Sequence, residues 1–120
     1  MPTERPRRRL ADIRDNVDRI ESHVAGLTFQ QFQVDKKSRD AVERCMERIA
    51  EAARKLGDRY DGRYPDLDLP ALRQMGSVFR HDDDAVDAGV VWATIESRLP
   101  EIRQMAETEI ARIDAGEDAP

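Results

Sequence analysis

The sequence predicts an all-α protein, a bundle of four to five helices that run up and down. Apolar residues recur every three or four positions over most of the 120 residues, which is the spacing of one helical face. No stretch of any length alternates apolar and polar residues as a half-buried strand would. Hydrophobic residues make up 39% of the chain and charged residues 38%, a balance typical of amphipathic helices that each bury one narrow stripe.

The length suits one domain with a single core, which we expect to span residues 7–113. Residues 1–6 are expected to form a flexible N-terminus, and the polar segment 114–120 a disordered tail.

The first helix is expected from Arg7 to about Ala25, because an apolar stripe ends just before Gly26. A short helical turn or loop pinned to the core should follow around Phe29 and Phe32. The longest helix is expected from about Asp35 to Leu56, with Gly57 as a left-handed cap. The two stripes comprise Leu10, Ile13, Val17, Ile20 and Val24 in the first helix, and Ala41, Val42, Cys45, Met46, Ile49, Ala52, Ala53 and Leu56 in the second.

The next helix should begin near Pro70, whose missing N–H suits a first helical turn. It should end near His81, because the carboxylates of Asp82, Asp83 and Asp84 repel one another and oppose the negative end of the helix dipole. Asp87 is expected to be the N-cap of the last helix. That helix carries Pro100, which should bend or interrupt it.

Charge and cysteine content restrict the functions that the chain can have. The formal net charge is −5, so any RNA contact should be local, since nucleic-acid binding depends on Lys and Arg. The basic cluster from Arg5 to Arg9 is more typical of a solvated helix start than of a phosphate patch. No apolar run approaches the length of a membrane span, and Cys45 is the only cysteine, so we expect a cytoplasmic protein without membrane contact.

His81 is the residue best suited to chemistry, because it follows Arg80 at a helix end and precedes three carboxylates. Nearby carboxylates favour the imidazolium form, so this histidine could exchange protons near neutral pH. The alternative interpretation is a solvated helix end with a run of charges. The motifs of conventional enzymes are absent, and no cluster of metal ligands is evident, so neither a metal nor another cofactor is expected. The other histidine, His23, lies beside the first apolar stripe and is interpreted as structural or solvent-facing.

The segments "RLADI", "GLTFQQF", "RDAVER", "EAARKL", "YP", "RH" and "VVW…LP" follow one another in this order. Together they resemble the HepT-like family, also known as domain of unknown function 86, of the HEPN superfamily. The resemblance extends from about Arg9 to Arg103. It implies a two-fold homodimer with a metal-independent endoribonuclease site, formed where two copies of an R-x4-H-x-Y motif face each other. It also implies a toxin of a type VII-like toxin–antitoxin system, whose MNT-type nucleotidyltransferase antitoxin adenylylates the motif tyrosine in some systems.

Carried over position by position, the motif histidine is His81, whereas Gly76 replaces the arginine and Asp83 replaces the tyrosine. Arg80 resembles a variant of the family in which an arginine directly precedes the histidine. The resemblance therefore implies His81 and Arg80 as catalytic residues, and the possible supporting residues are Asp82, Asp83, Ser77 and Arg73. If adenylylation occurs, it needs a substitute for the tyrosine, such as Tyr60, Tyr64 or Ser77.

Three interpretations remain open at this point. Two copies of His81 and Arg80 could supply an acid, a base and a cation for cleavage of RNA. The aspartates would repel the phosphate unless they point away or pair with Arg80 and Arg73, so a catalytically impaired partner of a nucleotidyltransferase is the alternative. An unrelated helical adaptor is the third interpretation. The neighbouring reading frame would distinguish these, because a nucleotidyltransferase there would favour the toxin–antitoxin system.

Overall fold

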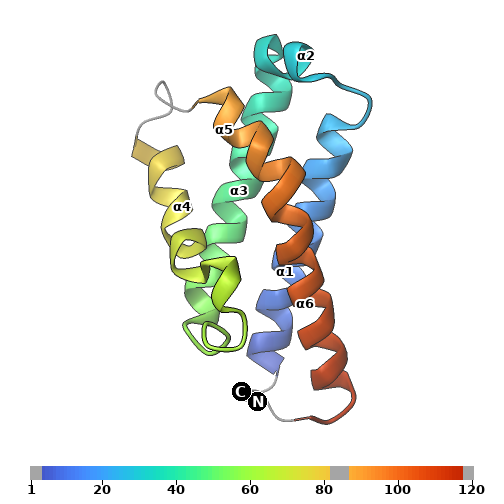
Figure 1. Ribbon diagram of the computed structural model, residues 1–120, viewed down its shortest axis with the longest axis vertical. Coiled ribbons are helices and arrows are strands. Elements are labelled where there is room, and N and C mark those ends of the chain that lie inside the picture. The colour runs from blue at the N-terminus through green and yellow to red at the C-terminus, as the bar shows by residue number, and fades with distance from the viewer. Residues whose placement is uncertain (1–3, 82–86, 118–120) are drawn as a thin grey trace.

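The computed structural model describes the backbone of residues 4–81 and 87–117, and the side chains of these residues except 4 and 77–81. This part of the chain consists of helices and turns, without a strand, so the all-α prediction is confirmed. Helices α1 (Glu4–Val24) and α3 (Lys36–Leu56) lie side by side and run in opposite directions (Figure 1). Helix α6 (Leu99–Asp114) packs on α1, and α4 (Leu69–His81) packs on α3.

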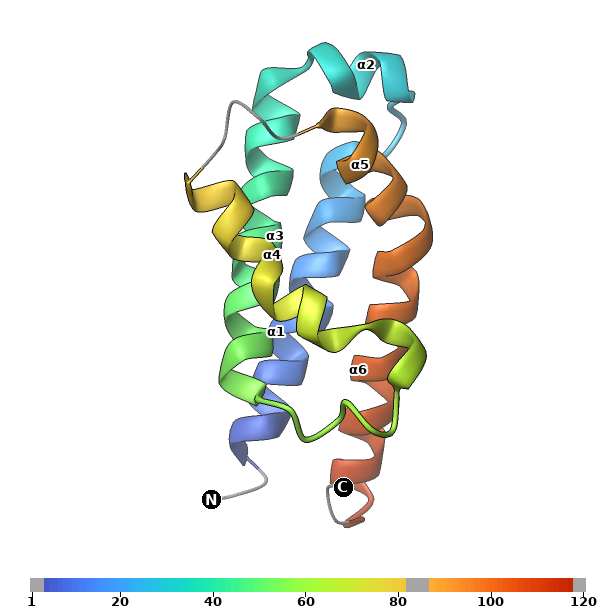
Figure 2. The same cartoon turned by 60° about the vertical axis from the view of Figure 1, so that its left-hand side comes forward.

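The four long helices alternate in direction, as expected for an up-and-down bundle, and α4 lies at its edge (Figure 2). Two short helices, α2 (Phe29–Val34) and α5 (Ala88–Ala93), cover one end of the bundle. They are held together by aromatic packing, because the Trp92 ring centroid lies 5.2 Å from that of Phe32 and 6.0 Å from that of Phe29. The predicted short helical turn after Gly26 is therefore a capped helix that adheres to the core through Phe32.

The core is built from the apolar stripes that the sequence predicts. Leu10, Ile13, Val17 and Ile20 of α1 are fully buried, and Val24 packs against them. In α3 the predicted residues from Val42 to Leu56 are buried, while Ala41 is half-buried. Burial of such stripes supplies most of the stability of helices of this length.

The helix boundaries differ from the expectation at both ends of the chain. Helix α1 begins at Glu4, inside the segment expected to be flexible, and α6 extends to Asp114, the first residue of the expected tail. The Arg7 Nε atom lies 2.7 Å from an oxygen of Asp114, so an ion pair joins the two ends. Gly57 has the expected positive φ of 78°, but its ψ of −154° lies outside the left-handed helical region.

Pro100 interrupts the last helix in a specific way. Between α5 and α6 lies a π-helical segment, η3 (Thr94–Arg98), in which the Leu99 N–H bonds to the Thr94 carbonyl. Pro100 has no N–H to donate to Glu96, so the normal helical bond is missing at this point. The hydroxyls of Thr94 and Ser97 donate to carbonyls one turn earlier, at 2.8 Å each. The predicted interruption is therefore a local widening of a continuous helical rod.

Candidate active site

The motif residues lie at the C-terminal end of α4. His81 is the last residue of this helix, and Ser77 and Arg80 lie within its final turn. Because residues three and four apart share one side of a helix, positions 77, 80 and 81 fall on the same side of α4. The side chains of Ser77, Arg80 and His81, and the whole of Asp82 and Asp83, lie outside the described residues.

Helix α4 is placed by contacts at its start. Asp68, directly before it, adopts the left-handed conformation with φ of 49° and ψ of 58°, and its side chain accepts a hydrogen bond from the Ala71 N–H at 3.3 Å. Arg98 donates to the Asp68 carbonyl at 2.7 Å and so connects this turn to η3. Leu69 and Leu72 then bury one face of the helix in the core. These contacts fix the direction in which the end of α4 leaves the bundle.

Gly76 lies on the same buried face as Leu69 and Leu72. A residue without a side chain at this position suits the packing of α4 on α3. The position that carries an arginine in the resembling motif therefore points towards the interior in this chain. An arginine at this position would place a long cation on the buried face of α4.

Arg73 has a structural role that the sequence did not indicate. Its guanidinium makes two hydrogen bonds to the Asp61 carboxylate, at 2.9 and 2.7 Å, and a third to the Gly57 carbonyl at 3.1 Å. Hydrogen bonding by Arg73 is the main cause that lowers the pKa of Asp61 below its usual value. Burial opposes this shift, and the charge of Arg73 adds to it. Arg73 therefore ties α4 to the turn after α3, and it is already paired within the part of the chain that the structure describes.

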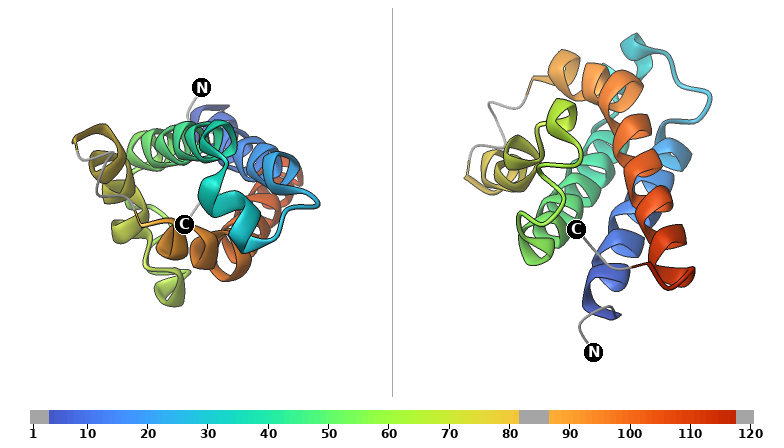
Figure 3. Two further views of the ribbon diagram at one scale, coloured as in Figure 1. Left: turned by 90° about the horizontal axis from the view of Figure 1, so that it is seen from above. Right: turned by 60° about the horizontal axis from the view of Figure 1, so that its bottom comes forward.

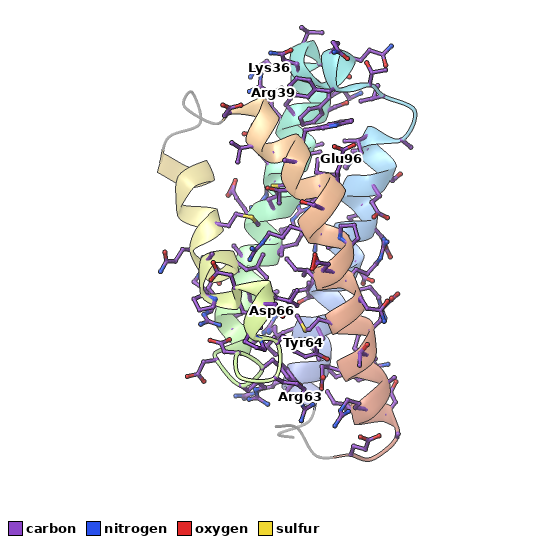
Figure 4. All side chains as sticks on the ribbon, viewed as in Figure 1. Lys36, Arg39, Arg63, Tyr64, Asp66 and Glu96 are labelled. Carbon is purple, nitrogen blue, oxygen red and sulfur yellow. The ribbon has the colours of Figure 1, made fainter. Side chains whose placement is uncertain are left out.

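Tyr64 is held in a polar network at the other end of the molecule (Figure 4). Its hydroxyl donates to the carboxylate of Glu109 at 2.5 Å, and Arg63 binds the same carboxylate at 2.8 Å. Glu109 is only 1% exposed, so these partners stabilise a buried charge. Burial, followed by the hydrogen bond to Glu109, raises the pKa of Tyr64 to about 12.

Neither tyrosine considered as a substitute adenylylation site is well suited to that role. Tyr60 is 1% exposed, and its buried hydroxyl has no hydrogen-bond partner among the described residues. The Tyr64 hydroxyl is already bound to Glu109, and its high pKa disfavours the nucleophilic oxyanion. Modification of either residue would first require opening of this end of the bundle.

Two further searches concern cofactors and membranes. Over residues 4–81 and 87–117, as far as the side chains are described, no group of three His, Cys, Asp or Glu side chains is arranged to hold a metal ion. None of the helices in the described part of the chain is both long and apolar enough to cross a membrane. Cys45 is buried, and burial is the main cause of the raised pKa of its thiol, as expected for a small core residue.

Comparison with known proteins agrees with the resemblance to the HepT-like family. The chain is 30% identical over 105 residues to "Putative RNase MJ0125" of Methanocaldococcus jannaschii, covering 88% of this chain and 90% of that protein. It is 28% identical over 94 residues to "Probable ribonuclease HepT" of Thermococcus cleftensis, covering 78% and 86%. No solved structure matches the chain significantly. The family model described as ribonuclease HepT-like matches residues 13–109, from the middle of α1, through α3 and α4, to most of α6. This chain therefore belongs to the ribonuclease HepT-like family.

Proposed function

We propose that this protein is a metal-independent endoribonuclease and the toxin component of a type VII-like toxin–antitoxin system. Membership of the ribonuclease HepT-like family supports an RNase function. The observation that carries the finer proposal is that His81, the one motif residue kept in this chain, ends a helix that lies at the edge of the bundle. A second copy can approach such an edge without displacing the core.

In the proposed homodimer, two copies of His81 and Arg80 face each other across the two-fold axis. One imidazole takes the proton from the 2′-hydroxyl of RNA, and the other donates a proton to the leaving 5′-oxygen. The two guanidinium groups of Arg80 neutralise the charge that develops on the phosphorane. Such a reaction ends in a 2′,3′-cyclic phosphate and a 5′-hydroxyl. Asp82 at most orients the imidazole.

Arg73 plays no direct part in this proposal, because its hydrogen bonds to Asp61 and Gly57 occupy it near the start of α4. This pairing also removes one of the two cations considered as a partner for the aspartates. The negative charge of Asp83 is therefore expected to oppose phosphate binding, and a substitution that removes this carboxylate should relieve the repulsion.

The test compares RNA cleavage by the wild type and the Asp83→Tyr variant, each in the presence of EDTA. The variant removes a carboxylate and restores the motif tyrosine, so we expect faster cleavage, unaffected by the chelator, with cyclic phosphate ends. Light scattering over a dilution series measures the dimer in the same preparations. A monomer at micromolar concentration, or cleavage that EDTA abolishes, would contradict the composite metal-independent site.

The second candidate function is a catalytically impaired subunit that binds an MNT-type nucleotidyltransferase. It is favoured by the replacement of the motif arginine with Gly76, which is buried against the bundle, and of the tyrosine with Asp83. Absence of cleavage by both the wild type and Asp83→Tyr, together with a stable complex with the nucleotidyltransferase, would support this alternative. In either case, the antitoxin is expected to act by binding or by modifying Ser77, since Tyr60 and Tyr64 are buried or engaged.

A further inference from the structure

A groove of about 480 Å³ runs along the outer side of the α1–α3 pair. Seen from above, α1 and α3 form one side of the molecule, and the other long helices lie behind them (Figure 3). The floor of the groove is low because Asn16 and Ala52 are short, while the residues around them are long. Its remaining lining residues are Arg9, Asp12 and Arg19 from α1, and Arg44, Glu47, Arg48, Glu51 and Lys55 from α3.

The groove is more positive than the rest of the protein. It has five cationic side chains and three carboxylates, an excess of two positive charges in a chain of net charge −5. The cations lie on both walls, so a bound anion would meet positive charge from two helices. The groove therefore concentrates positive charge locally, as RNA contact in an acidic protein requires.

The carboxylates of the groove already have cationic partners. Asp12 lies 3.4 Å from Arg9, Glu47 lies 3.7 Å from Arg44, and Glu51 pairs with Arg54 and Lys55. Arg19 and Arg48 are exposed, and neither forms an ion pair with a carboxylate among the described residues. Among the cations of the groove, these two guanidinium groups are therefore the ones that no carboxylate of the described residues neutralises.

Arg19 and Arg48 also lie near each other although they come from different helices. Burial raises the pKa of the Cys45 thiol, and the charges of Arg48 and Arg19 both oppose that rise. Both arginines also line the same groove, Arg19 from α1 and Arg48 from α3. A ligand with several phosphates can therefore reach both of them at once.

Asn16 adds an unpaired polar group at the floor. Its Nδ2 donates to the Asp12 carbonyl at 2.8 Å, while its buried Oδ1 has no hydrogen-bond partner among the described residues. If the Asn16 amide were flipped, its Oδ1 would face the Asp12 carbonyl oxygen, and two acceptors would repel each other. The orientation with Nδ2 towards this carbonyl is therefore the favourable one. Asn16 is 6% exposed, and an acceptor left unpaired at that depth is costly. A hydroxyl or amino donor that reaches the floor would remove that cost.

We propose that this groove, which is lined by α1 and α3 alone, binds the phosphate backbone of single-stranded RNA through Arg19 and Arg48, separately from the motif residues of α4. From Arg9 to Arg19 the helix rises about 15 Å, which suits several linked phosphates better than one small anion. The groove lies on the surface of two packed helices, whose axes in such packing are about 8–10 Å apart, so it is narrow enough to favour a flexible single strand over a duplex. The inference rests on the proposed RNase function, for which the groove supplies a second contact with the substrate.

The test uses the double variant Arg19→Gln/Arg48→Gln and the matched control Arg8→Gln/Arg59→Gln. Both lose two positive charges, and Arg8 and Arg59 are exposed residues that do not line the groove. Binding of a fluorescent oligouridylate is followed by anisotropy at several salt concentrations. Its riboses carry 2′-O-methyl groups, so the RNA cannot be cleaved and binding is measured alone. Circular dichroism verifies that each variant is folded.

In the groove variant, the slope of log K against log salt should be less steep by about 0.7 for each lost phosphate contact, or by ~1.4 for two contacts. This corresponds to roughly 25-fold weaker binding at 0.1 M salt, whereas the control should keep the wild-type slope. Equal losses in both variants, or an unchanged slope in the groove variant, would overturn the inference even if the protein cleaves RNA. Retained RNA binding with loss of the nucleotidyltransferase complex would overturn it too, and would assign the groove to an acidic protein. Groove-dependent binding without any cleavage would support the inference and contradict only the proposed function.

Discussion

Replacement of Arg73 with glutamine should destabilise the protein without removing a catalytic group. The substitution removes the charge and the paired hydrogen bonds to Asp61, and it leaves the Gly57 carbonyl without its side-chain donor. A hydrogen bond to a charged group contributes about 1.5–3 kcal/mol. The Arg73 and Asp61 side chains are 21% and 27% exposed, so solvent screens the pair in part, and we expect a loss of about 2 kcal/mol.

The assay is urea unfolding followed by circular dichroism, with RNA cleavage measured on the same preparations. A loss of 2 kcal/mol corresponds to a fall in Tm of roughly 8 °C for a chain of this size. The variant Asp61→Asn and the double variant complete a mutant cycle, in which the two changes should be clearly non-additive. Unchanged stability together with abolished cleavage would refute the structural assignment and would make Arg73 part of the active site.

The same ion pair predicts a dependence of stability on pH. The Arg73 guanidinium lowers the pKa of Asp61 below its ordinary value, so the folded state favours the ionised carboxylate. A lowered pKa contributes stability above the pKa of the unfolded chain, and that contribution is lost as the pH falls through the folded value. The difference in stability between the wild type and Asp61→Asn should therefore be constant near neutrality and shrink below about pH 4. A difference that grows towards acid pH would contradict the pairing.

Two further substitutions test the packing at the two ends of the molecule. Glu109→Gln removes a carboxylate that is 1% exposed and held by Arg63 and Tyr64, and it should cost about 2 kcal/mol in urea unfolding, because the partners lose their counter-charge. Gly76→Arg restores the motif arginine on a buried face, and it should cost about 3 kcal/mol and not increase cleavage. A stable, more active Gly76→Arg variant would show that this side of α4 has room for the family's arginine.

The helices could be predicted from the sequence because each apolar stripe belongs to one segment. Leu10 to Ile20 and Val42 to Leu56 repeat with helical spacing, and that local pattern is sufficient to define both helices. The N-cap role of Asp87 was likewise confirmed, since its side chain accepts a hydrogen bond from the Gly89 N–H at 2.7 Å. The type of interruption at Pro100 was not predictable, because a proline at this position is compatible with either a bend or a π-helical segment.

Contacts between segments were beyond the reach of the sequence. Arg73 pairs with Asp61 across a turn, and Tyr64 binds Glu109 on a helix 45 residues away, and neither spacing follows a helical or strand period. The α1–α3 groove needs the relative rotation of two helices, which the stripes define only roughly. The positions of His81 and Arg80 came from the resemblance of the motif, and their placement in the last turn of α4 followed from the helix pattern. Their catalytic roles stay predictions.

The central claim is that His81 performs proton transfer in RNA cleavage. Its most direct test is the cleavage rate of His81→Ala on an RNA with free 2′-hydroxyls, compared with the wild type and with Arg80→Ala. We predict a loss of about 100-fold or more for His81→Ala, the usual cost of a lost acid–base group, with unchanged dimerisation and unchanged binding of 2′-O-methyl RNA. Arg80→Ala should impair the same step, since a phosphate cation is lost. Cleavage by His81→Ala at the wild-type rate would contradict the account.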